Sequence, residues 1–85
     1  MALSVNLVAP DRRLWRGDAL SVSAPSVEGS IGLLPGHEPI LSVLRAGTVR
    51  VKELNGEWKS LDIESGFISF DHDVVTIVAE PAPTV

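Results

Sequence analysis

The chain has 85 residues, no cysteine and a formal net charge of −4, so we expect one domain with a small core and no disulfide, in a reducing compartment rather than a secreted setting. Acidic residues spread along the chain argue against nucleic acid as a partner, because that class of ligand needs clustered Lys and Arg. The absence of a run of about 18 apolar residues argues against membrane insertion, and the N-terminal residues lack the charged and apolar regions of a secretory signal.

A period of two in the apolar residues predicts short β-strands throughout the chain. Apolar and polar residues alternate in four places, and a fifth run is almost continuously β-branched, which predicts a strand buried on both faces. These segments are 3–9, 20–24, 49–51, 61–63 and, for the continuous run, 74–79. Turn signals lie between them at 10–11, 16–18, 25–29, 46–47, 55–56, 65–66 and 71–73. The pattern predicts an all-β antiparallel sandwich or flattened barrel.

The remaining segments add little regular structure. The stretch 39–45 has a weak helical pattern, but it is too short and lacks a cap, so we predict no helix there. We assign residues 1–80 to the β-sandwich domain and residues 81–85 to an extended Pro-rich tail, because proline disfavours the α conformation of the residue before it. Apolar residues make up 45% of the chain, which fits either a core of Val, Leu and Ile or an additional patch buried against a partner.

The Asn55-Gly56 pair suggests a hairpin, and the side-chain pattern restricts its loop length. A two-residue loop would put Val49 opposite Asp62 and Lys52 opposite Lys59. A shift of one residue turns every side chain to the other face, so we predict a loop of odd length. Both 54–56, with a glycine bulge, and 55–57 satisfy this condition. Either loop places Val49, Val51, Leu61 and Ile63 on one buried face.

The most informative segment is 29–41, where glycines and prolines interrupt every regular element between apolar residues. Glycine reaches positive φ and proline fixes φ, so the segment is predicted to be a shaped loop that is anchored in the core at both ends. His37 and Glu38 within it could form an acid–base pair, but neighbouring side chains on extended backbone point in opposite directions. We therefore interpret His37 as a structural or interface residue rather than a catalytic one.

Other candidate sites are weak. The triplet Asp71-His72-Asp73 could ligate a metal, but a solvated turn between strands explains it more simply. The Gly29–Gly32 segment lacks the lysine of a phosphate-binding loop, and no nucleophile motif is present. Trp15 and Trp58 are candidates for the core or for an interface. From the residues alone we predict no catalytic residue, cofactor or metal, and we expect an interaction module.

Several motifs in matching order resemble the epsilon subunit of F-type ATP synthases. The segment 28–41 reads Glu-Gly-Ser-Ile-Gly-Leu-Leu-Pro-Gly-His-Glu-Pro-Ile-Leu, and Ala-Gly-Thr-Val-Arg-Val follows at 46–51. Both match that family's signature loop and the strand after it. The first strand at 3–10 and the Trp-Arg-Gly triplet at 15–17 are also similar, and Ser-Gly-Phe-Ile at 65–68 resembles a Gly-Gly element, with Ser65 in place of the first glycine. The resemblance covers essentially the whole chain.

This resemblance implies an antiparallel β-sandwich of about ten short strands and a non-catalytic role in the rotor. In the family, the domain binds the gamma subunit and the ring of membrane c subunits and helps to couple proton flow to ATP synthesis. Carried over by position, the resemblance implies that Glu28, Gly29 and Ser30 face the c ring and that His37 lies near gamma. It also implies a peripheral location on the cytoplasmic face of a bacterial plasma membrane, or of an equivalent energy-coupling membrane.

Two features depart from the family. An acidic residue is common where this chain has Ser30, so Glu28 would carry more of any electrostatic contact with the ring. Family members also commonly continue into a C-terminal hairpin of two helices, which the 85 residues lack, so inhibition of hydrolysis and ATP binding by that hairpin cannot be inferred. The chain is either naturally short, which we favour, or a shortened piece.

Two other functions remain open at this stage. The chain could be an unrelated β-sandwich module that binds a protein or a small ligand, or, as a minor possibility, a small hydrolase or metal-dependent enzyme that uses His37 or His72. Formation of a stable complex with a gamma subunit would distinguish the rotor hypothesis from both.

Overall fold

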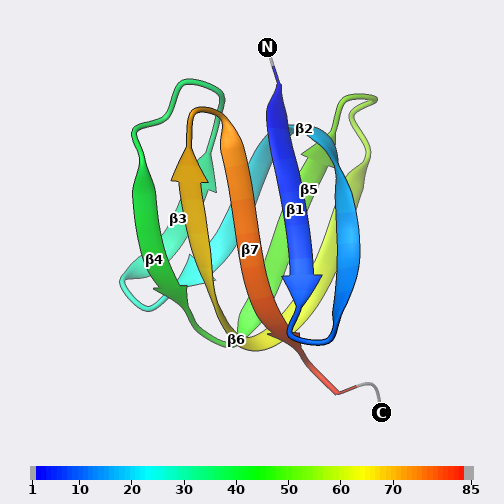
Figure 1. The fold of residues 1–85 in the computed structure, drawn as a ribbon, viewed down its shortest axis with the longest axis vertical. Coiled ribbons are helices and arrows are strands. Elements are labelled where there is room, and N and C mark those ends of the chain that lie inside the picture. The colour runs from blue at the N-terminus through cyan, green and yellow to red at the C-terminus, as the bar shows by residue number, and fades with distance from the viewer. Residues whose placement is uncertain (1, 84–85) are drawn as a thin grey trace.

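The computed structural model describes residues 2–83, which form seven β-strands and no helix (Figure 1). In chain order the strands are β1 (Leu3–Ala9), β2 (Arg12–Ser26), β3 (Gly29–Leu33), β4 (Ile40–Leu44), β5 (Gly47–Glu53), β6 (Trp58–Asp71) and β7 (Val74–Pro81). Within this described part of the chain, no helix is long and apolar enough to cross a membrane. The segment 39–45, which we rejected as a helix, contains strand β4.

The strands form a two-layered sandwich because β2 and β6 each bend from one layer into the other (Figure 1). Strand β2 pairs with β1 over 12–19, with β5 over 19–23 and with β3 over 22–26. Strand β6 pairs first with β5 over 58–63, and then with β4 and β7 over 63–71. One layer therefore contains β4, the second half of β6, β7 and β1, and the other contains β3, the second half of β2, β5 and the first half of β6.

The all-β class is confirmed, but the number and direction of the strands differ from our prediction. The structure has seven strands rather than about ten, because two expected turns lie inside long strands. The signal at 16–18 lies within the 15 residues of β2, and the signal at 65–66 lies within the 14 residues of β6, where the register shifts between Ile63 and Ser65. Residues 16–18 pair with β1 in regular register, and the register shift in β6 disturbs that strand without ending it. The sheet is also mixed rather than antiparallel, since β1 and β7 pair in parallel.

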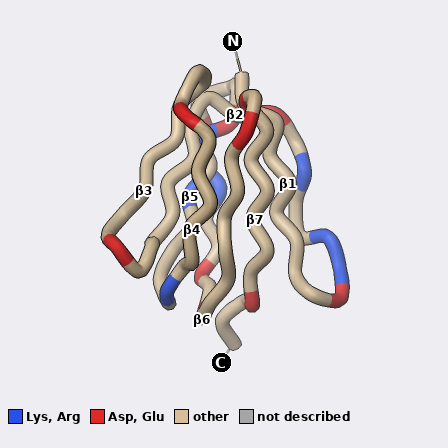
Figure 2. The backbone as a smooth tube through the Cα atoms, turned by 60° about the vertical axis from the view of Figure 1, so that its left-hand side comes forward, with Lys and Arg blue, Asp and Glu red and all other residues tan. Residues whose placement is uncertain are grey.

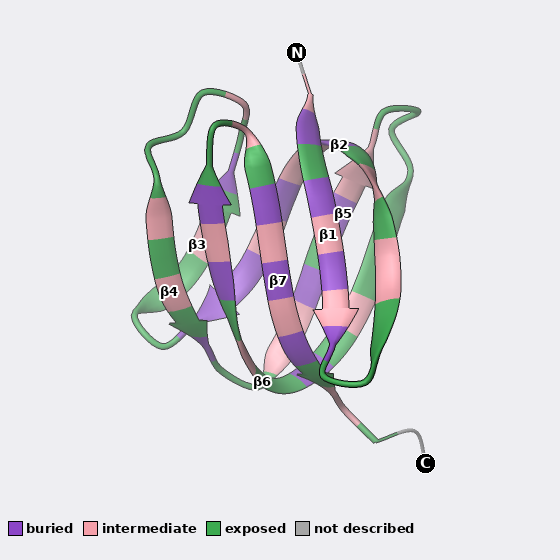
Figure 3. Cartoon of the chain, in the orientation of Figure 1, coloured by how far each residue is buried: buried purple, intermediate pink, exposed green. Residues whose placement is uncertain are grey.

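Alternation of burial along the strands confirms the period of two (Figure 3). On β1, Leu3, Val5, Leu7 and Ala9 are buried, and the residues between them are partly or fully exposed. Strand β7 also alternates, so our prediction that it is buried on both faces is wrong: Val74 is 43% exposed. The inner face of β7 packs in the core, whereas no element of residues 2–83 covers its outer face.

The β5–β6 hairpin has an odd-length loop, as the apolar pattern predicts. Val49 pairs with Leu61 and Val51 pairs with Lys59, and Glu53 donates its N–H to the Glu57 carbonyl at 2.8 Å. The loop is therefore 54–56, and Gly56 has a φ of 87°, which suits a glycine bulge. Val49, Val51 and Ile63 are buried, and Leu61 is half-buried on the same face.

The end of the chain continues the pairing of β7. The Ala82 N–H donates to the Asp62 carbonyl at 2.9 Å, one residue beyond the last residue of the strand. Of the expected tail 81–85, the positions 84–85 lie outside the described residues.

Candidate interaction surfaces

The residues that we expected to face a c ring lie where β2 turns into β3: Glu28 is in the turn, and Gly29 and Ser30 begin β3. All three are exposed, and we call this segment the 28–30 turn. The adjoining Ser26 is 1% exposed and organises the turn. Its Oγ accepts the Glu28 N–H at 3.1 Å and shares a hydrogen bond of 2.9 Å with the Ser42 hydroxyl. The turn is thus a shaped projection anchored by a buried hydroxyl, with the Glu28 carboxylate in solvent.

A second shaped segment joins β3 to β4 and contains His37. The His37 N–H donates to the Leu34 carbonyl at 3.2 Å, with Pro35 and Gly36 between them and a Gly36 φ of 87°. This is the proline–glycine pattern of a type II turn, in which the third residue needs positive φ. The loop predicted over 29–41 is nevertheless too long, because Gly29–Leu33 form strand β3 and Ile40–Leu44 form β4. Only the segment 34–39 between these strands is a loop, and its turn has this local cause.

The tip of this loop is attached to the turn between β6 and β7. The Gly36 N–H donates to the Asp73 Oδ1 at 2.7 Å, and the His37 ring lies edge-on to the Phe70 ring with centroids 5.6 Å apart. The His37 Nδ1 lies 2.7 Å from the Glu38 carbonyl oxygen, so the imidazole is engaged by backbone and by an aromatic ring. These contacts fix the position of the exposed His37 side chain.

The structure separates two groups of residues that are close in sequence. The 28–30 turn and the His37 loop lie at opposite ends of β3, at the lower and upper left of Figure 1. Five strand residues span about 16 Å, so the two segments form distinct surfaces. Each of the two surfaces could bind a separate protein partner.

The triplet Asp71-His72-Asp73 forms the tight turn between β6 and β7. Asp71 pairs with Val74, and His72 and Asp73 have φ of 49° and 62°, which is typical of a two-residue hairpin turn. The His72 Nδ1 lies 2.7 Å from the Asp71 Oδ1, and both side chains are largely exposed. Within residues 2–83, no three His, Cys, Asp or Glu residues are grouped so that they could hold a metal ion.

One surface feature was not evident from the sequence. Between Asp71 and Glu80 at the strand ends, the outward-facing side chains of β1, β4, β6 and β7 form a continuous area without charge, which we call the uncharged face. Several of its apolar members are well exposed, including Leu41 at 75% and Val43 at 58%. Its members are Ser4, Asn6, Val8, Leu41, Val43, Phe67, Ser69, Val74, Thr76 and Val78.

Charged residues lie around this face rather than on it. In Figure 2, the central lengths of β4, β7 and β1 are free of charge, and acidic residues lie at the upper and lower ends. The outer face of the other layer differs: Arg50 and Lys52 project from β5, and Asp62 on β6 accepts a hydrogen bond of 2.7 Å from Thr48. Depletion of charge at the centre of a patch is typical of the buried part of a protein interface.

Comparison with known proteins agrees with the resemblance found in the sequence. Residues 2–84 match the family model for the beta-sandwich domain of the ATP synthase delta/epsilon chain. The ATP synthase epsilon chain of Rhodococcus jostii is 47% identical over 81 residues, which cover 94% of this chain and 66% of that relative. The epsilon chain of Micrococcus luteus is 45% identical over 80 residues, which cover 94% of this chain and 88% of that relative.

Solved structures share the fold. A chain of the Euglena gracilis mitochondrial ATP synthase, solved as an OSCP/F1/c-ring assembly, superposes with a TM-score of 0.86 at 26% identity, over 94% of this chain and 53% of that chain. A chain of the Tetrahymena thermophila mitochondrial ATP synthase central stalk and c-ring gives a TM-score of 0.76 at 16% identity, over 94% and 64% of the respective chains. The chain thus corresponds to about half to two thirds of the length of these structural neighbours.

Proposed function

Because the chain belongs to the family of ATP synthase delta/epsilon chain β-sandwich domains, we propose that it is a non-catalytic rotor subunit of a proton-translocating ATP synthase. In this role it binds the gamma subunit and the ring of membrane c subunits, and so helps to couple ion flow to ATP synthesis. The Euglena assembly, which includes the c-ring, supports this placement. The matching bacterial relatives favour the cytoplasmic face of a bacterial plasma membrane as its location.

The observation that carries the proposal is the uncharged face. An isolated small domain gains nothing in solubility from an exposed surface that includes Leu41, Val43 and Phe67. The same surface becomes favourable when a partner covers it, because burial of apolar area contributes about 25 cal/mol per Å² before the costs of association. We assign this face, with His37 at its upper end, to the gamma subunit.

The 28–30 turn is the second contact in the proposal. It lies at the opposite end of β3 from His37, so the domain can bind gamma and the c ring at the same time. Its exposed Glu28 carboxylate suits a basic group on a polar loop of the ring, and the bonds that Ser26 makes hold the turn in shape without the ring. A charged contact of this kind contributes more to orientation and association rate than to affinity.

The test is binding to the matching gamma subunit, measured by isothermal titration calorimetry. Val43→Lys places one ammonium group on the β4 side of the uncharged face, next to Phe67, where a partner that covers the face would bury it without a counter-charge. We expect the Kd to rise about tenfold. Thermal unfolding of the variant should stay close to that of the wild type, since the Val43 side chain is 58% exposed.

Ser60→Lys is the matched control, because it adds the same charge at an exposed strand position on the opposite outer face. Its Kd for gamma should stay within about twofold of wild type. Weakened binding by Ser60→Lys with unchanged binding by Val43→Lys would move the gamma contact to the other layer. Failure of the wild-type chain to bind gamma at all would favour the alternative, an unrelated β-sandwich binding module.

A further inference from the structure

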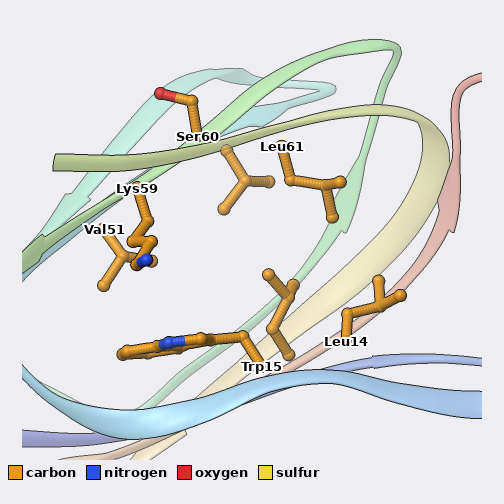
Figure 4. Close-up of a pocket in the computed structure, with 8 residues that line it drawn as sticks. Leu14, Trp15, Val51, Lys59, Ser60 and Leu61 are labelled. Atoms are coloured by element: carbon orange, nitrogen blue, oxygen red, sulfur yellow. The ribbon is translucent and has the colours of Figure 1, made fainter.

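A cavity of about 280 Å³ is lined by residues of β1, β2, β5 and β6 and by none of β3 or β4 (Figure 4). It lies where the first half of β2 and the first half of β6 face each other: β2 pairs there with β1, and β6 pairs there with β5. Its walls are mostly apolar and come from four strands. The apolar lining residues are Leu7, Leu14, Trp15, Val49, Val51 and Leu61, and the polar ones are Lys59 and Ser60.

The position of the Trp15 ring keeps this cavity open. The indole forms one wall opposite Leu61 (Figure 4), and it packs against the backbone at Gly17. A Cβ on residue 17 would lie 2.8 Å from the Trp15 Cζ2 and 3.0 Å from its Cη2. Only glycine permits this ring position, because real Cβ atoms do not approach other atoms so closely. The missing side chain at residue 17 therefore leaves room for the Trp15 ring at the edge of the cavity.

One cationic group lies beside the apolar space. Lys59 lines the cavity, and its side chain extends toward Trp15 (Figure 4). The ion pairs of the described residues are those of Arg12 with Asp11 and of His72 with Asp71, and neither involves Lys59. An apolar space with one unpaired cation at its edge suits a ligand with an apolar body and one negative charge.

We propose that this cavity binds a small free monocarboxylate with an unbranched apolar chain, with the chain against Trp15 and Leu61 and the carboxylate at Lys59. The volume equals the liquid volume of about nine water molecules, so the ligand is the size of a medium-chain fatty acid. A ligand with two charges or a bulky polar body would leave polar groups unpaired against aliphatic walls. The site meets β1 at the buried Leu7, whereas the uncharged face lies on the outer side of that strand, and the proposal is independent of the assignment to the rotor.

Octanoate is the probe, and Trp15 fluorescence is the signal, measured in a Trp58→Phe background so that one tryptophan remains. We expect a saturable change with octanoate, and binding of 1-octanol that is a few-fold weaker because it lacks the charge. Lys59→Gln should remove this difference between the two ligands. Lys52→Gln is the matched control, since Lys52 lies on the opposite side of the strand layer, 5.8 Å from the centre of the Trp58 ring.

Leu61→Phe should abolish binding of both probes, because the larger side chain enters the cavity. If this variant is unfolded by circular dichroism, chemical-shift changes on addition of octanoate to the wild type replace it, with the methyl groups of Leu14, Val51 and Leu61 expected to respond. A linear, unsaturable signal, equal affinity for octanoate and 1-octanol, or shift changes confined to residues outside the cavity would each overturn the proposal.

Discussion

Gly66→Ala tests whether the close approach of β6 and β7 requires a missing side chain. Gly66 pairs with Ala79, and a Cβ at position 66 would lie 2.3 Å from the Val78 carbonyl oxygen and 2.8 Å from the Ala79 Cα. Both atoms belong to backbone in the middle of the layer, so relief requires the strands to move apart. Overpacking of a well-packed site costs about 1–3 kcal/mol, and this site lies at the upper end because the two nearest atoms are backbone rather than the end of a flexible side chain.

We therefore expect a loss of about 3 kcal/mol in the free energy of unfolding, which lowers the Tm of a domain of this size by roughly 10–20 °C. Urea unfolding followed by circular dichroism measures the change, and an unaltered m-value would show that the denatured state is unaffected.

Alanine substitutions at two other glycines separate destabilisation by steric overlap from destabilisation by an unfavourable backbone conformation. Neither Gly32 nor Gly56 has an atom within 4 Å of a built Cβ, but Gly56 has a φ of 87°. Gly32→Ala should leave stability unchanged or slightly raised, whereas Gly56→Ala should cost about 1 kcal/mol for the left-handed backbone. The reasoning about Gly66 is refuted if its alanine variant is no less stable than the Gly32 variant.

Three further predictions concern the loops. Ser30→Asp should tighten binding to the matching c ring, and an unchanged or weaker affinity in a pull-down titration would contradict an electrostatic role for the turn. Asp73→Ala removes the acceptor of the Gly36 N–H, so hydrogen exchange at that amide should accelerate about fivefold, for a bond of about 1 kcal/mol; an equal rate would show that the contact does not hold the loop. Ser26→Ala leaves the Glu28 N–H without its acceptor and should lower stability by about 1–2 kcal/mol in thermal unfolding; a change below about 0.5 kcal/mol would argue that water replaces the hydroxyl.

The sequence by itself determined the local features of this protein. Alternation along the chain is a short-range property, so it identified most of the strands, the buried residues of β1 and the odd length of the β5–β6 loop. The Pro35-Gly36 pair likewise determines a turn through the φ values that these two residues allow. The family signature around His37 required no structure to be recognised.

Tertiary structure decided the features that depend on residues far apart in the chain. The bends within β2 and β6 depend on which neighbours these strands pair with, so the same glycine signals looked like turns in the sequence. The parallel pairing of β1 with β7 and the Asp73 anchor of the 34–39 loop join segments that the sequence separates by more than thirty residues. The uncharged face likewise combines β1 and β4 with the distant β6–β7 hairpin. An alternating pattern predicts which side of one strand is polar. Only the assembled sheet shows that the outward-facing sides of β1, β4, β6 and β7 lie next to one another and form one area without charge.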